Sequence, residues 1–219
     1  MLLRLMRLIL IRYFWVINLV LFSSSTLLAQ TRYLVTGYTL TFDMTIEEPG
    51  YEFTGEVEAY DATEIKNYLF DNPNIHTLRI TGPGGYGPAG RDISAYLVQH
   101  DIKTEAFGEC SSACARIFLG GKTRILAQGA TLGFHRPWIN KETQKRFFDA
   151  NRAEKNWNEE FDYVPWIYDV AIEDVVEGIT FLRSRGVDMD FILKIYSTSS
   201  YDMWEPAREE LIAAGVVTE

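Results

Sequence analysis

The strongest constraint on the fold is an order of features that occurs twice: an apolar strand-like run, a cluster of small residues, and an amphipathic helix-like segment. Residues 77–80 lead into Gly82-Pro83-Gly84-Gly85 and then a helix over 89–99. Residues 103–107 lead into Gly108, after which a serine cluster begins another helix. Strands and helices that alternate at this spacing predict an α/β fold with a mainly parallel sheet and right-handed crossovers. Both clusters follow carboxyl ends of strands, where open α/β sheets place their sites.

The remaining segments complete a single domain over residues 30–219. On the N-terminal side, a strand or edge hairpin is expected over 33–46 and a second strand over 51–59. A helix follows and ends near Phe70, with Asp61 able to cap its start.

Beyond Pro137 the pattern is helical. Helices are expected over 141–166, 168–185, 187–196 and 205–214, and together they form a C-terminal helical layer. The first of them is rich in aromatic residues, which we assign to packing on the sheet in preference to a substrate groove or a subunit interface. These residues are Phe147, Phe148, Trp157 and Phe161.

The first 29 residues are organised like an export signal. Residues 1–12 hold three arginines and no acid, residues 13–22 are apolar, and the following polar stretch ends in a small residue, Ala29. We predict cleavage after Ala29 and a periplasmic or otherwise exported protein. The alternatives are retention as an N-terminal membrane anchor facing the outside, for which the apolar run is short, and a buried helix.

Charge limits the partners of the exported body. Without residues 1–29, 18 Lys and Arg stand against 30 Asp and Glu, a net charge of about −12. So acidic a protein is a poor ligand for nucleic-acid phosphates, and no nucleic-acid partner is expected.

The only two cysteines, Cys110 and Cys114, flank the serine pair. In an oxidising compartment they can form a disulfide, provided that Cys110 precedes the helix, or they can pack as two small buried side chains; the sequence leaves both open. Because no other cysteine and no clustered histidine is present, neither a zinc site nor any other cofactor is expected.

A serine and a histidine in this region have the placement that nucleophilic catalysis requires. Ser112 stands at the start of a predicted helix, where backbone N–H groups are free, and His135 ends an apolar run over 130–134. The other histidines, His76 and His100, lie in solvated turns. A helix cap at Ser112 and a buried structural histidine at His135 are the alternatives.

Three motifs in this order resemble the Clp protease proteolytic subunit and its exported relatives, members of the ClpP/crotonase superfamily. They are Gly82-Pro83-Gly84-Gly85, residues 108–113 (GECSSA) and residues 132–137 (LGFHRP). The likeness spans residues 55–137 and is weaker near the C-terminus. It implies stacked βαβ units and a serine hydrolase, most specifically a peptidase with a Ser-His-Asp triad.

The resemblance also implies roles for single residues. Ser112 corresponds to the nucleophile, His135 to the base, and Gly85 and Ala113 to the residues whose N–H groups bind the oxyanion. The carboxylate that orients the histidine falls on Asp202, before the last helix. The gap from His135 is longer than in the family, so other acids stay open: Asp162, Asp169, Asp188 and Asp190.

A second function fits the same sequence, namely a catalytically silent scaffold whose groove binds a partner. An acyl-CoA enzyme of the crotonase type fits less well, because that class works through glutamates and an exported protein meets little CoA. A serine–lysine peptidase fits less well because a histidine stands at the position of the base. We expect a peptide or protein substrate and a monomer or small homo-oligomer, and no phosphate-binding loop of the GxxxxGK[ST] type occurs.

Overall fold

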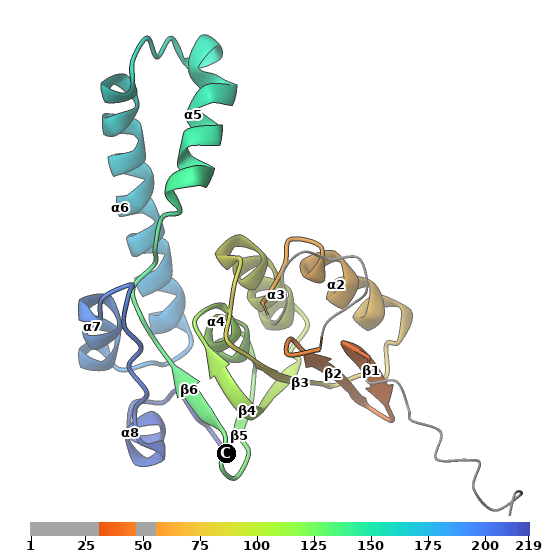
Figure 1. The fold of residues 1–219 in the computed structure, drawn as a ribbon. Helices are drawn as coiled ribbons and strands as arrows, with labels where there is room; N and C mark the ends of the chain where they lie inside the picture. The colour runs from red at the N-terminus through yellow and green to blue at the C-terminus, as the bar shows by residue number, and fades with distance from the viewer. Residues whose placement is uncertain (1–30, 47–55) are drawn as a thin grey trace, which may run out of the picture. The chain divides into compact units, whose positions relative to one another are not determined.

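A hairpin begins the structure, a computed structural model that describes residues 31–46 and 56–219 (Figure 1). Strand β1 (Tyr33–Thr36) pairs antiparallel with β2 (Thr39–Asp43), so that of the strand or edge hairpin expected over 33–46 it is the hairpin that forms. The predicted signal, residues 1–29, lies outside the described residues, as do residues 51–55 of the second predicted strand. The rest of that strand is reduced to one bridge, between Val57 and Gly85.

Six strands form a mixed, mostly parallel sheet in the order β1-β2-β3-β4-β5, with β6 also paired to β4. The inner strands are β3 (Thr77–Gly82) and β4 (Lys103–Ser111), and the short strands are β5 (Arg124–Leu126) and β6 (Thr131–Gly133). All pairs from β2 onwards are parallel, which confirms the predicted α/β class. Because β6 pairs with the last residues of β4, the ends of these two strands lie side by side.

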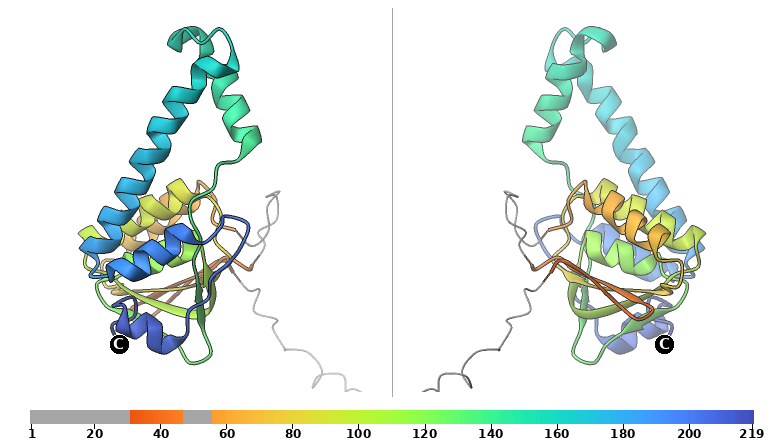
Figure 2. Two further views of the ribbon diagram at one scale, coloured as in Figure 1. Left: turned by 90° about the vertical axis from the view of Figure 1, so that its left-hand side faces the viewer. Right: turned by 90° about the vertical axis from the view of Figure 1, so that its right-hand side faces the viewer.

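Three helices cover one face of the sheet: α2 (Asp61–Asp71), α3 (Gly87–Gln99) and α4 (Ala113–Leu119) (Figures 1 and 2). Their apolar residues recur at helical spacing and meet the inward-facing residues of β2 and β3, which alternate along each strand. The completely buried side chains of this core include Leu40, Phe42, Leu78, Ile80, Ile93, Leu97, Ile117 and Phe118.

Asp61 does not cap α2 as expected. Its carboxylate is completely buried and accepts hydrogen bonds from the Arg32 guanidinium, at 3.1 and 2.7 Å, from the Tyr33 hydroxyl and from the Glu58 N–H. Arg32 is buried as well, and it donates further to the carbonyls of Met44 and Glu56. A charge buried in this way needs such partners, so the pair joins the residue before β1 to the first residue of α2.

The helix predicted over 141–166 is two helices, α5 (Lys141–Lys155) and α6 (Glu160–Ser184). Asn156 ends α5 in the left-handed conformation, with a φ of +58°, which asparagine tolerates better than most residues. A capping box between Glu159 and Asp162 then begins α6. The chain finishes with α7 (Met189–Ser197) and α8 (Arg208–Ala213), near the predicted positions.

The aromatic residues of this region do not pack on the sheet. Phe148, Trp157 and Tyr163 form a cluster of their own between α5 and α6, separate from the core under the sheet, and Phe161 is 78% exposed. Figures 1 and 2 show that α5 leads away from the sheet and that α6 returns toward it, so α5 and the first half of α6 lie beyond the sheet. The cluster therefore stabilises the pair of helices against each other.

Strand β5 contains one charged residue. Its Arg124 is buried, and the guanidinium donates to the carbonyls of Gly121, Arg185, Gly215 and Val216. Burial, followed by the nearby charge of Arg185, lowers the pKa of Arg124 to about 10.

No helix in the described part of the chain is long and apolar enough to cross a membrane.

Candidate active site

Ser112 occupies the sharp turn between β4 and α4. Its φ of +54° and ψ of −117° lie outside the regions that a serine normally adopts, a conformation that costs on the order of 1–3 kcal/mol. The backbone is held from the next strand, because the Ser112 N–H donates to the carbonyl of Gly133 at 2.9 Å. Backbone strain of this kind concentrates where a side chain must be presented in one direction.

Two glycines allow the chain to pass close to this turn. A Cβ on Gly84 would lie 2.7 Å from both the Ser111 carbonyl oxygen and the Ser112 Cβ, and Gly84 has a φ of +112°. A Cβ on Gly133 would collide with the Ser111 hydroxyl. Neither position accommodates a larger residue without moving Ser111 or Ser112, which explains why both are glycine.

His135 lies two residues after the end of β6 and contacts Ser112 from that neighbouring strand. Its Nε2 lies 2.8 Å from the Ser112 Oγ, and its Nδ1 lies 2.7 Å from the carbonyl oxygen of Arg136. A carbonyl can only accept, so Nδ1 carries the proton and Nε2 is left with a lone pair toward the serine hydroxyl. The histidine is thus held in the tautomer that can take the proton of Ser112.

The structure brings Gly85 and Ala113 to the same place. Val57 bridges the glycine turn, donating to the carbonyl of Gly84 at 2.5 Å and accepting from the N–H of Tyr86 at 2.7 Å. The N–H of Gly85 takes no part in this pair of hydrogen bonds. Within residues 56–219, neither that N–H nor the N–H of Ala113 donates a backbone hydrogen bond, and both residues line the cleft beside Ser112. Backbone N–H groups left without a partner inside a fold are the donors that oxyanion sites use.

Asp202, the expected third residue of the triad, is not brought to His135. It is exposed, and its Oδ1 accepts from the N–H of Met203 at 2.8 Å. The orienting contact to Nδ1 comes instead from the Arg136 carbonyl, and the Arg136 N–H is itself anchored on the Thr198 carbonyl at 3.2 Å. A backbone carbonyl has no signature in the sequence, so this partner could not be predicted from residue types.

Two of the alternative acids also have structural roles elsewhere. Asp162 belongs to the capping box of α6, and Asp188 caps α7 by accepting from two backbone N–H groups. The other histidines behave as predicted: His76 and His100 are exposed.

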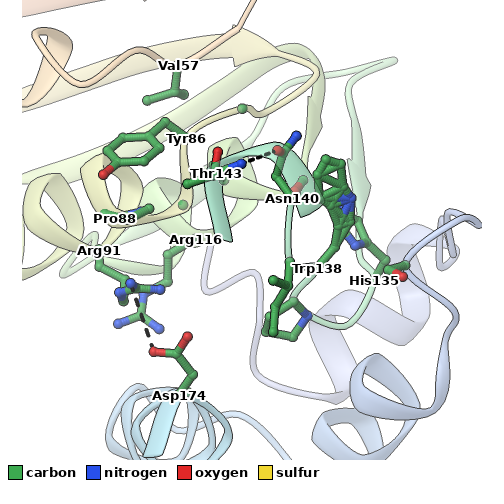
Figure 3. Close-up of a pocket in the computed structure, with 18 of the residues that line it drawn as sticks. Val57, Tyr86, Pro88, Arg91, Arg116, His135, Trp138, Asn140, Thr143 and Asp174 are labelled. Carbon is green, nitrogen blue, oxygen red and sulfur yellow. Dashed lines mark hydrogen bonds and ion pairs between the residues drawn. The ribbon is translucent and has the colours of Figure 1, made fainter. Parts of the chain in front are cut away.

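A cleft of about 1240 Å³ opens over Ser112 and His135. Figure 3 shows His135 and Trp138 on one side of it and Tyr86 and Arg91 on the other, with Asp174 of α6 below. It extends along the segment that contains Val57 and along the first turn of α3. A site of this size admits a chain-like substrate as well as a small molecule.

Two ion pairs lie among the residues that line the cleft. The Arg116 guanidinium donates to the Glu177 carboxylate at 2.6 and 3.3 Å, and Arg91 lies 3.9 Å from Asp174. Burial, then the neighbouring carboxylates of Asp61 and Glu56, raises the pKa of Glu58 on the cleft wall.

Cys110 and Cys114 form a disulfide in the structure. The sequence had left open whether they form this bridge or pack as two separate side chains. Cys110 belongs to β4 and Cys114 to α4, and their Cα atoms are 5.1 Å apart, which is a normal separation for a bridged pair. The described residues contain no group of His, Cys, Asp and Glu side chains that could hold a metal ion.

Sequence comparison does not assign the protein to a family. No protein-family model matches the chain, and no curated protein is similar to it in sequence. What the structure defines is an α/β fold with a mixed, mostly parallel sheet and C-terminal helices, which has a serine and a histidine in hydrogen-bond contact at one end of its strands.

Proposed function

We propose that this protein is a serine hydrolase of the ClpP/crotonase type, a peptidase that acts outside the cytoplasm. The observation that carries the proposal is the 2.8 Å contact between the Ser112 Oγ and the Nε2 of a histidine whose other nitrogen is occupied by a carbonyl. The strained backbone of Ser112 and the two free N–H groups beside it support the same conclusion.

The chemistry is acyl transfer to water. Ser112 attacks the carbonyl carbon of the substrate while His135 takes the hydroxyl proton, and the N–H groups of Gly85 and Ala113 bind the oxyanion that forms. His135 then protonates the leaving amine, which departs and leaves an acyl ester on Ser112. Water hydrolyses this ester by the same steps, with His135 first as base and then as acid.

Several features favour peptides over small esters as substrates. The cleft is large, about 1240 Å³, and the three motifs resemble those of a peptidase family. The export signal predicted over 1–29 and the Cys110–Cys114 bridge favour an oxidising compartment. Among the described residues no carboxylate is hydrogen-bonded to His135, and the Arg136 carbonyl orients its ring.

The experiment is hydrolysis of a mixed library of proteome-derived peptides by the purified full-length protein, with short acyl esters in parallel. We expect peptide cleavage that Ser112→Ala abolishes and that His135→Ala slows about 10²–10⁴-fold, the range of general-base contributions. Ser111→Ala and His100→Ala are the matched controls and retain the activity.

Cleavage of esters alone would support the serine hydrolase and contradict the assignment of peptides as its substrates. If no substrate is turned over by folded protein while peptides still bind in the cleft, the alternative of a silent binding scaffold replaces the proposal.

A further inference from the structure

The disulfide encloses the proposed nucleophile. Cys110 is the residue before Ser111 at the end of β4, and Cys114 is the second residue of α4, so the bridge closes a loop that contains only Ser111, Ser112 and Ala113. Those three residues include the nucleophile and one proposed oxyanion donor. Both sulfur-bearing side chains are completely buried, so the bridge anchors the loop from its core side.

The enclosed backbone needs an external restraint. Within the described residues, Ser112 is one of three residues other than glycine with a positive φ. The other two, Asp101 and Asn156, are of types that adopt the left-handed region by themselves. Ser112, with a ψ of −117°, is not in that region. Its conformation is therefore imposed by its surroundings.

A bridge over so short a separation acts locally. The stabilisation of a fold by a disulfide grows with the length of chain that it closes, and here the sequence separation is only 4. Its main constraint falls on the path from β4 into α4. The opposite side of the same turn is fixed by Gly84 and by the carbonyl of Gly133, so Ser112 is confined between the bridge and these two glycines.

We propose that the Cys110–Cys114 disulfide is a positioning element that sets Ser112 against His135, so that the hydrolase becomes competent only after oxidation. The inference rests on the proposed function. The two thiols are oxidised to one disulfide, and their two electrons and two protons pass to a thiol-exchange oxidant whose own disulfide is reduced to two thiols. A chain with reduced cysteines remains latent, which confines hydrolysis to an oxidising compartment.

The test compares oxidised and reduced forms of one protein. The full-length protein is unfolded in urea with dithiothreitol, which closes to its own cyclic disulfide as the bridge is reduced, and is refolded with the reductant kept or removed. The rate of labelling by a fluorophosphonate is then measured for both forms and for the double variant Cys110→Ala/Cys114→Ala. Circular dichroism and urea unfolding establish that each form is folded.

We expect the reduced form and the double variant to be folded but labelled about 10²-fold more slowly, the cost of misplacing a reacting group by roughly 1 Å. Reoxidation restores the rate in the wild type and not in the variant. In NMR spectra the imidazole signals of His135 shift on reduction, whereas those of the exposed His76 and His100 do not.

Labelling of the folded, reduced forms at the wild-type rate overturns the inference. So does failure of both forms to fold, because the bridge then acts on the whole fold. If the oxidised wild type itself is not labelled, the proposed hydrolase function has failed, and this outcome is distinct because it appears without any reduction.

Discussion

Replacing Gly84 by alanine should disable the site without unfolding the protein. An added Cβ would lie 2.7 Å from the Ser111 carbonyl oxygen and from the Ser112 Cβ, and 2.9 Å from the Ala113 nitrogen. All three atoms belong to the nucleophile turn. Ordinary van der Waals contact begins at 3.4 Å, so the segment that contains Gly84 and the nucleophile turn must separate by about 0.7 Å.

A displacement of this size is large for catalysis. Misplacing a reacting group by about 1 Å costs roughly 10²-fold in rate, and losing one oxyanion donor costs about 10²–10³-fold. We therefore expect Gly84→Ala to lower the rate of fluorophosphonate labelling at least about 10²-fold. The φ of +112° adds a conformational cost on the order of 1–3 kcal/mol, which urea unfolding measures separately.

Gly129→Ala is the matched control. Gly129 also has a positive φ, +80°, but its added Cβ meets no atom within 4 Å. This variant should lose stability and keep the full labelling rate. If Gly84→Ala is labelled as fast as Gly129→Ala, the packing of Gly84 against the nucleophile turn does not position Ser112, and the reasoning is wrong.

Two further predictions concern the buried network around Asp61. Asp61→Ala leaves the Arg32 guanidinium buried without its carboxylate and should lower the free energy of unfolding by about 3–5 kcal/mol in urea titrations. The control Asp149→Ala breaks the exposed pair with Lys145 and should lower it by under about 0.5 kcal/mol. Equal losses in the two variants would contradict the structural role given to Asp61. Burial, and then the hydrogen bond and charge of Asp61, raise the pKa of Tyr33 above its ordinary 10.0, so the folded state keeps a proton that the unfolded state loses, and the stability present below pH 10 declines as the pH rises further. Tyr33→Phe should flatten this decline, measured as unfolding free energy at about pH 9 and pH 11, and the exposed Tyr201→Phe should not.

The parts of the fold that could be predicted are those set by local pattern. The two repeats of strand, small-residue cluster and helix predict parallel strands, and parallel strands end at the same edge of a sheet. The proximity of Ser112 and His135 follows from this, since Ser112 stands directly after β4, His135 stands two residues after β6, and the two strands are neighbours.

The parts that could not be predicted depend on partners distant in the sequence or on the backbone. An aspartate at the start of a helix has the pattern of a cap, but Asp61 accepts from Arg32, 29 residues away. The orienting partner of His135 is a carbonyl, which every residue possesses. Asn156 ends α5 inside a segment whose helical periodicity continues on both sides, so two helices have the pattern of one.

The central claim is that Ser112 is an activated nucleophile, and location of a covalent adduct tests it most directly. The full-length protein is treated with a fluorophosphonate and digested, and the modified residue is identified by mass spectrometry, with Ser112→Ala and His135→Ala alongside. We predict an adduct on Ser112 that disappears in the first variant and is lost or strongly slowed in the second. Absence of an adduct on folded, oxidised wild-type protein, or an adduct on Ser111, would contradict the account.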